Sequence, residues 1–97
     1  MNGIELIAAE RKRQIEELGY DYTHDHLYKS NQLALAGATY ALTPVINEFM
    51  IDQQGKPYLW PWNLEYWKPT PEDRVKELSK AGALIAAQID YELAKTK

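Results

Sequence analysis

The chain contains no cysteine, so disulfide bonds and thiolate metal sites are excluded. It has no apolar run long enough to span a membrane. Basic residues are not in excess, because 11 lysines and arginines face 14 acids and the net charge is −3. A nucleic-acid backbone selects for clustered basic residues, so we expect no nucleic-acid partner. The N-terminus begins like a helix rather than a signal peptide, and we therefore expect a cytoplasmic protein.

What is present suits one folded domain spanning residues 1–97. The chain is 45% hydrophobic and 11% aromatic, which is enough for a core and atypical of disorder. In three segments the apolar residues recur at helical spacing. We therefore predict an all-α fold, a small bundle of three main helices.

The first and last helices carry clear end signals. The first is predicted from about Gly3 to Leu18, with Asn2 and Glu5 forming a capping box. The last is predicted to follow Thr70 as its cap and Pro71 as its first residue. Its apolar residues fall on one stripe, made of Val75, Leu78, Gly82, Ile85, Ala86, Ile89 and Leu93.

The second helix, predicted from about Gln32 to Leu42 with Ser30 or Asn31 as cap, is apolar all round. Such a helix is buried all round. Three helices in a short chain cannot easily surround it, so we predict a homo-oligomer, most simply a dimer. A further short helix is expected over residues 45–51.

Residues 58–69 form a segment that we call the aromatic strap. It contains all three tryptophans, Trp60, Trp62 and Trp67, and its prolines rule out a long helix. Tryptophan can stack on a planar ligand or fill a protein interface. The strap could instead simply cover the open end of the bundle.

Two other groups are candidates for a site. His24 and Asp25 lie in a histidine-aspartate turn whose irregular spacing predicts backbone capping or ligand contact rather than a metal site. Arg11 falls within the apolar stripe of the first helix. If it faces inward it must pair, with Asp25, with Asp73 or with an anionic ligand; otherwise it reaches the surface.

Acidic pairs for catalysis are missing. All-α nucleotide pyrophosphohydrolases carry ExxE and ExxD pairs that hold magnesium on one helical face, and neither spacing occurs here. We find no catalytic residues and no sign of a cofactor. The sequence therefore favours binding over catalysis.

The chain resembles a family of small phage and prophage proteins. Their shared pattern is an IAAERxRQIEEEG helix, a histidine-aspartate turn, an LALA helix, a WPW segment ending in WWKP, and a final helix like RDLVKAGALIAAEID. Residues 7–17 (IAAERKRQIEE), His24-Asp25, residues 33–36 (LALA), 60–62 (WPW), 67–69 (WKP) and 80–85 (KAGALI) carry it. His26, Tyr28 and Asn31-Gln32 depart from it.

The resemblance implies a bacterial host cell but no activity. Our first hypothesis is a protein that holds a small, planar, anionic ligand, such as a nucleotide-derived immune signal of the host. The second is a module that docks on a host enzyme through the strap. The third is a metal-dependent nucleotide hydrolase. For the first hypothesis the predicted ligand-binding residues are Arg11, His24, Asp25, Trp60, Trp62, Trp67 and Lys80.

Overall fold

The computed structural model describes residues 1–18 and 31–95, and this part of the chain is helical with no strand. Three main helices form it: α1 (Gly3–Leu18), α3 (Gln32–Leu42) and α4 (Arg74–Lys95). The expected all-α fold with three main helices is confirmed. No helix in the described ranges is long and apolar enough to cross a membrane.

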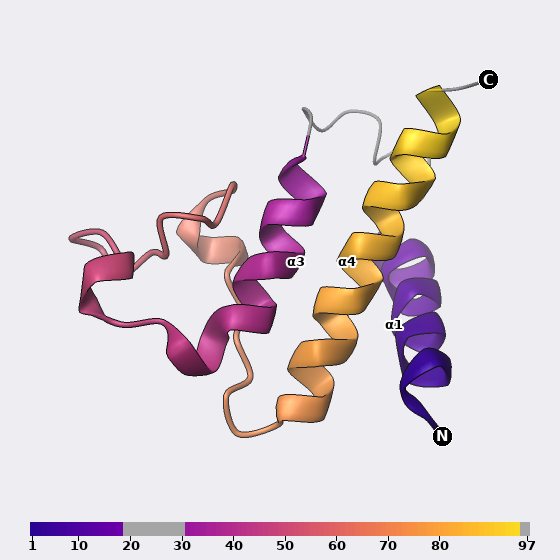
Figure 1. Cartoon of the computed structure of the whole chain (residues 1–97), viewed down its shortest axis with the longest axis horizontal. Coiled ribbons are helices and arrows are strands. Elements are labelled where there is room, and N and C mark those ends of the chain that lie inside the picture. The colour runs from indigo at the N-terminus through magenta and orange to yellow at the C-terminus, as the bar shows by residue number, and fades with distance from the viewer. Residues whose placement is uncertain (19–30, 96–97) are drawn as a thin grey trace.

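Helix α4 is the centre of the molecule, with α1 on one side and α3 on the other (Figure 1). We expected α3 to be the central, fully buried helix, and this is wrong. Helix α3 buries Leu33, Ala36 and Tyr40, whereas Leu35 is exposed. The reason lies in α4, which is twice as long and carries small buried residues that let both neighbouring helices approach: Ala81, Ala83 and Ala87.

Contact between α1 and α4 is close. A Cβ atom added at Gly82 would lie 2.5 Å from Ile7 Cδ1, so a larger residue there would force the Ile7 side chain to move. One turn along, Arg11 Nη2 donates a hydrogen bond to Asp90 Oδ2 at 3.0 Å. The predicted capping box of α1 is confirmed, since Asn2 and Glu5 exchange hydrogen bonds at 3.0 and 2.9 Å.

The N-terminus of α3 is capped from another helix. Asn31 is the N-cap residue but has a left-handed backbone, with φ of 67°, and among the described residues no amide donates to its side chain. The expected position of the cap at Asn31 is therefore correct, but the side chain of Asn31 makes no capping hydrogen bond in the described structure. The Ala34 N–H instead donates to Gln88 Oε1 of α4 at 3.1 Å.

Helix α4 begins three residues later than a cap at Thr70 implies. Asp73 is the residue whose side chain accepts from the helix, through the Lys76 N–H at 3.0 Å. Thr70 belongs to the preceding turn, where its N–H donates to the buried Glu77 Oε2 at 2.9 Å. That tertiary bond places Thr70 outside the helix.

Residues 45–51 do not form the short helix that we expected. They contribute to two 3-10 turns, η1 (Thr43–Val45) and η2 (Glu48–Met50). Ile46 and Asn47 between them have extended backbones. The Asn47 side chain accepts from the Phe49 N–H at 2.9 Å, so Asn47 caps η2 as a separate turn.

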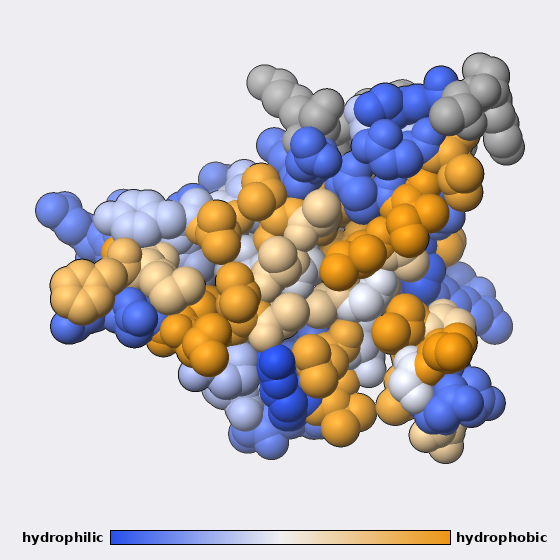
Figure 2. Space-filling model, in the orientation of Figure 1, coloured by the Kyte–Doolittle hydropathy of each residue, from blue (hydrophilic) through white to orange (hydrophobic). Residues whose placement is uncertain are grey.

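The apolar stripe predicted on the last helix exists, but it does not face the core. The buried face of α4 consists instead of Glu77, Lys80, Ala81, Ala83, Leu84, Ala87 and Gln88. The stripe's large members, Val75, Leu78, Ile85, Ile89 and Leu93, are exposed. Figure 2 shows an apolar band over this face of α4 and over α3.

Gly37→Ala tests the close approach of α3 to α4. The added Cβ would lie 2.9 Å from the Ala81 carbonyl oxygen and 3.1 Å from Ile85 Cγ1, so the helices must separate. We expect a loss of about 1–3 kcal/mol in urea unfolding. Gly3→Ala is the control, because an added Cβ there meets no described atom within 4 Å. Equal stability of the two variants would contradict the packing.

Candidate functional site

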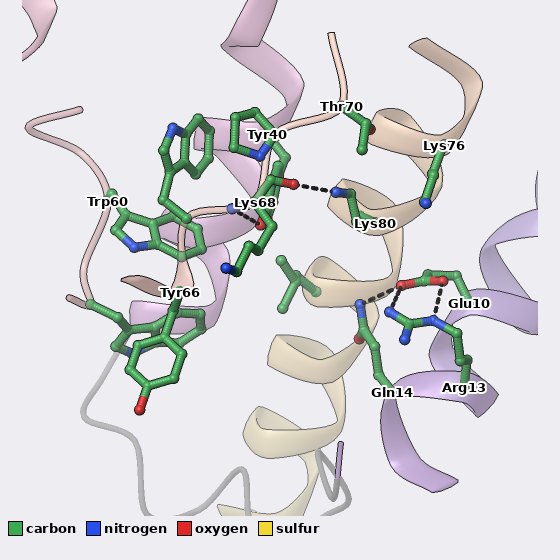
Figure 3. A pocket seen from close by; sticks show the side chains of 14 residues that line it. Glu10, Arg13, Gln14, Tyr40, Trp60, Tyr66, Lys68, Thr70, Lys76 and Lys80 are labelled. Atoms are coloured by element: carbon green, nitrogen blue, oxygen red, sulfur yellow. Dashed lines mark hydrogen bonds and ion pairs between the residues drawn. The ribbon is translucent and has the colours of Figure 1, made fainter. Parts of the chain in front are cut away.

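A cavity of about 770 Å³ lies between α1, α4 and the aromatic strap. This volume falls within the range of about 300–1,000 Å³ that is usual for small-molecule sites. Figure 3 shows aromatic side chains gathered on one side of the cavity and charged side chains from α1 and α4 on the other. The cavity is lined by Glu10, Arg13, Gln14, Tyr40, Trp60, Trp62, Tyr66, Trp67, Lys68, Pro69, Thr70, Lys76, Lys80 and Leu84.

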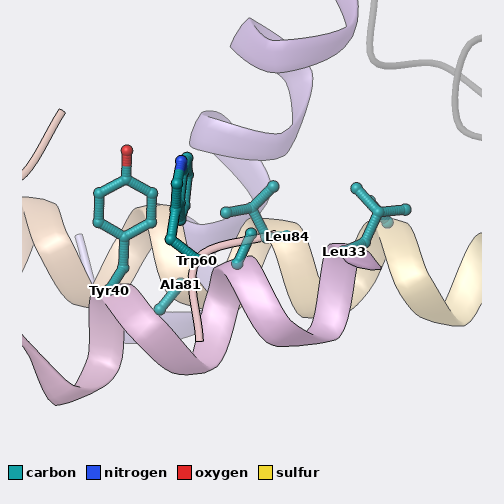
Figure 4. Close-up of a cluster of buried hydrophobic side chains, with 7 residues drawn as sticks. Leu33, Tyr40, Trp60, Ala81 and Leu84 are labelled. Atoms are coloured by element: carbon teal, nitrogen blue, oxygen red, sulfur yellow. The ribbon is translucent and has the colours of Figure 1, made fainter. Parts of the chain in front are cut away.

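The aromatic wall grows out of the hydrophobic core. Trp60 is 2% exposed and packs edge-on against Tyr40 of α3, with ring centroids 5.3 Å apart. Tyr40 also stacks on Trp67, at 4.8 Å and 26°. Figure 4 shows Trp60 beside Tyr40, in line with the α3–α4 core residues Leu33 and Leu84. The strap therefore covers the bundle and lines the cavity at once.

Hydrogen bonds fix the strap to both helices. The Lys68 N–H donates to the Tyr40 hydroxyl of α3 at 3.1 Å, and the Lys68 carbonyl accepts from Lys80 Nζ of α4 at 2.6 Å. Trp62 Nε1 donates to Gln32 Oε1 at 3.3 Å. Because the backbone of Lys68 is held at both polar groups, the cavity wall is preorganised.

Lys80 is a buried cation at the cavity wall. It is 9% exposed, and its ammonium lies 4.6 Å from the centroid of the Tyr40 ring. Within residues 1–18 and 31–95, no carboxylate lies within ion-pair distance of it. Burial lowers the pKa of Lys80 below its ordinary value of 10.5, and the positive charge of Lys76 lowers it further. The negative charges of Glu77 and Glu10 oppose this shift without cancelling it. A buried charge without an ion-pair partner in the described ranges is costly.

Two more lysines line the same cavity. Lys68 comes from the strap and Lys76 from the first turns of α4. In the part of the chain that the structure describes, neither ammonium makes an ion pair with a carboxylate. Both are exposed, so both are available to an incoming anion. The cavity thus holds three cations without carboxylate partners in the described residues.

Arg13 contributes less charge than its position suggests. Its Nε and Nη2 donate to the two carboxylate oxygens of Glu10 at 2.9 and 2.8 Å, and Nη1 donates to Glu17 at 3.3 Å. The hydrogen bond with Glu10 raises the pKa of Arg13 above its ordinary value. The guanidinium therefore forms a bidentate ion pair with Glu10, which neutralises its charge. This pair forms the α1 wall of the cavity.

Two buried polar atoms that belong to residues lining the cavity have no hydrogen-bond partner in the described structure. They are Gln14 Oε1 and Thr70 Oγ1. Gln14 Nε2 donates to Glu10 Oε2 at 3.3 Å, and because a carboxylate only accepts, the amide orientation is fixed. Buried polar groups are normally satisfied, and since both residues line the cavity, a bound molecule could supply the missing partners.

The structure brings together four of the seven predicted ligand-binding residues. Trp60, Trp62, Trp67 and Lys80 all line the cavity. Arg11 lies apart from them. It borders a groove between α1 and α4, and its Nη2 pairs with Asp90, a partner that we did not predict. The expected partner Asp25 lies outside the described residues. His24 and Asp25 lie outside the described residues.

Sequence reasoning missed several residues of the cavity. Tyr40 was predicted only as core, and Lys68 and Lys76 gave no pattern of their own. Gln14 lies three residues after Arg11 on α1 and carries no local signal of a binding role. Lys68 had one available signal, its place between Trp67 and Pro69 in the strap.

Metal chemistry finds no support in the described ranges. Among residues 1–18 and 31–95, no three histidine or acidic side chains lie close enough to hold a metal ion. The hydrolase hypothesis therefore gains no observation in its favour.

Lys80→Met tests the buried ammonium through pH. The folded-state pKa of Lys80 lies below its unfolded value, so between the two values the unfolded chain binds more protons and wild-type stability rises with pH. Lys80→Met has no ammonium at this position, so its stability lacks this dependence on pH. As the pH rises toward the ordinary lysine pKa of 10.5, we expect wild type to gain stability relative to Lys80→Met in urea unfolding. A difference that is constant with pH would contradict a depressed pKa.

Comparison with known proteins gives no relative. No family model, no curated protein and no solved structure matches the chain. The function therefore has to be argued from the cavity itself.

Proposed function

We infer that the protein binds a small, planar, anionic molecule in the cavity between α1, α4 and the strap. The observation that carries this inference is the buried Lys80 ammonium, which has only a carbonyl and a ring as described contacts and opens on a cavity with Lys68 and Lys76. Phosphate or a similar anion would provide the compensation that this charge lacks.

The aromatic wall argues for a ring in the ligand. Trp62 and Trp67 are partly buried and Tyr66 is exposed, so these side chains keep surface for stacking on the cavity side. Trp60 is too buried to offer much of its own surface, and it supports Trp62 at a centroid distance of 5.2 Å. Rings that are fixed before binding lose little entropy when a planar ligand stacks on them.

A nucleotide or a nucleotide-derived signal combines these two features. Its base would stack on the strap, and its phosphates would meet the lysines. Given the resemblance to small phage proteins, we propose that the protein sequesters such an immune signal of the bacterial host. No chemical step is required of it, since holding the ligand lowers its free concentration.

A ligand panel tests the proposal directly. We expect at least one cyclic nucleotide or ADP-ribose derivative to raise the melting temperature and to quench tryptophan fluorescence, because binding to the folded state stabilises it. Two controls separate the parts of the site. Inorganic phosphate tests the lysines alone, and the free nucleoside tests the aromatic strap alone. If no anionic nucleotide in the panel shifts the melting temperature, the proposal fails.

Lys76→Gln and Lys68→Gln test the role of the cavity lysines. Each removes one charge-assisted contact, worth about 1.5–3 kcal/mol, so affinity for the ligand should fall by about 10-fold or more. Lys12→Gln is the matched control, because Lys12 is an exposed lysine of α1 outside this cavity. Calorimetry on all three variants should show the loss only for the cavity lysines. Equal losses, or none, would count against the site.

A second candidate function, docking on a partner protein, has one observation in its favour. The strap tryptophans face inward, but Phe49 and Tyr58 nearby are 84% and 67% exposed around a small apolar groove. Large exposed aromatic side chains are typical of interface hot spots. Phe49→Ser should then abolish capture of a host enzyme while leaving nucleotide binding intact.

A further inference from the structure

One face of the helical layer is apolar and exposed. Cavity residues of α4 such as Lys80 and Leu84 point to one side, and the exposed stripe lies on the other. Within the stripe, Leu78, Ile85 and Ile89 recur at alternating spacings of seven and four residues, as in the seam of a helical bundle. Ile85 is 45% exposed and Ile89 is 54% exposed.

Both neighbouring helices meet this face. Helix α1 extends it with Ile4 and Ile15, which are exposed and line a groove with Ala86 of α4. Helix α3 meets it at Ile85, whose Cγ1 lies beside Gly37. Figure 2 shows apolar side chains of this kind across all three helices on the viewed face. A typical monomer exposes scattered apolar residues, whereas a continuous face across three helices marks an interaction site.

The architecture explains why this face needs a cover. Domains are built from at least two packed layers around a core. Here α1, α4 and α3 lie side by side as one layer, and the strap covers only the cavity side. The opposite side is half of a core, so a second layer of helices would complete it.

We propose that a second copy of this chain supplies that layer, through a two-fold interface. The face offers both a ridge and a groove: the large side chains of α4 form the ridge. The groove beside it, about 470 Å³ in volume, has Ala8 and Ala86 among its lining residues. In a two-fold arrangement, the ridge of each copy enters the groove of the other.

Charge at the edge of the groove supports a two-fold partner. Lys12 and Glu16 lie one turn apart on α1, border the groove and carry opposite signs, with side chains 75% and 62% exposed. A two-fold axis between them brings each lysine to the glutamate of the other copy. Within one copy the two side chains already lie 4.0 Å apart as an ion pair, and across the two-fold axis the same complementary charges meet.

The exposed area approaches what a dimer needs. Six aliphatic side chains at roughly half exposure supply on the order of 550 Å² per copy, about two thirds of the ~800 Å² that each partner contributes in a standard interface. They are Ile4, Ile15, Leu78, Ile85, Ile89 and Leu93.

Sedimentation equilibrium of the full chain tests this interface. We expect a wild-type dimer at micromolar concentration. For Ile89→Glu we expect the dimer dissociation constant to rise by about 100-fold or more, because an unpaired charge would be buried. Val45→Glu is the matched control, since Val45 is 61% exposed but lies in η1, outside the face. Wild type that remains a monomer, or an Ile89→Glu variant that stays as dimeric as Val45→Glu, would overturn the proposal.

Cross-linking keeps the test valid if Ile89→Glu fails to fold. Because the chain lacks cysteine, a single Ile89→Cys substitution gives a unique thiol, and a short bismaleimide should join two copies. Phe49→Cys, exposed but distant from the face in sequence and structure, should cross-link far less. Equal yields would contradict the interface. Ligand binding in the cavity is a separate property, so either proposal can fail while the other holds.

Discussion

The structure depends on how one peptide unit of the strap is held. The backbone of Lys68 donates to Tyr40 of α3 and accepts from Lys80 of α4. A segment whose regular structure is one short 3-10 turn, η3 (Leu64–Tyr66), is thereby tied to two helices at one point. The cost of this arrangement is a buried ammonium. The benefit is an aromatic wall at a fixed distance from the lysines. The same contact therefore explains both the stability of the strap and the unsatisfied charge in the cavity.

Local signals made the helices predictable. Asn2 and Glu5 encode the start of α1 within four residues, and apolar periodicity placed α3 from Gln32 to Leu42. Where a tertiary contact decided the outcome, the sequence misled. Thr70 has the pattern of a cap, but the buried Glu77 binds its N–H, and Asp73 instead caps a helix that begins at Arg74.

The site was predictable only in its aromatic half. Three tryptophans within eight residues are visible in any reading, and Lys80 stood out as a cation on the last helix. Lys68 and Lys76 could not be placed, because their proximity depends on the path of the strap over α4. Arg11 pairs with Asp90, a residue 79 positions away that no local pattern reveals.

The cap that α4 provides for α3 has a consequence for how the chain folds. The Ala34 N–H is satisfied by Gln88, whose amide is oriented by a hydrogen bond from Nε2 to Glu92 at 3.0 Å. A helix of 11 residues is marginal by itself, and this one lacks a local cap among the described residues. Helix α3 should therefore become ordered only as α4 docks on it, which makes folding of the two a single cooperative event rather than an assembly of preformed parts.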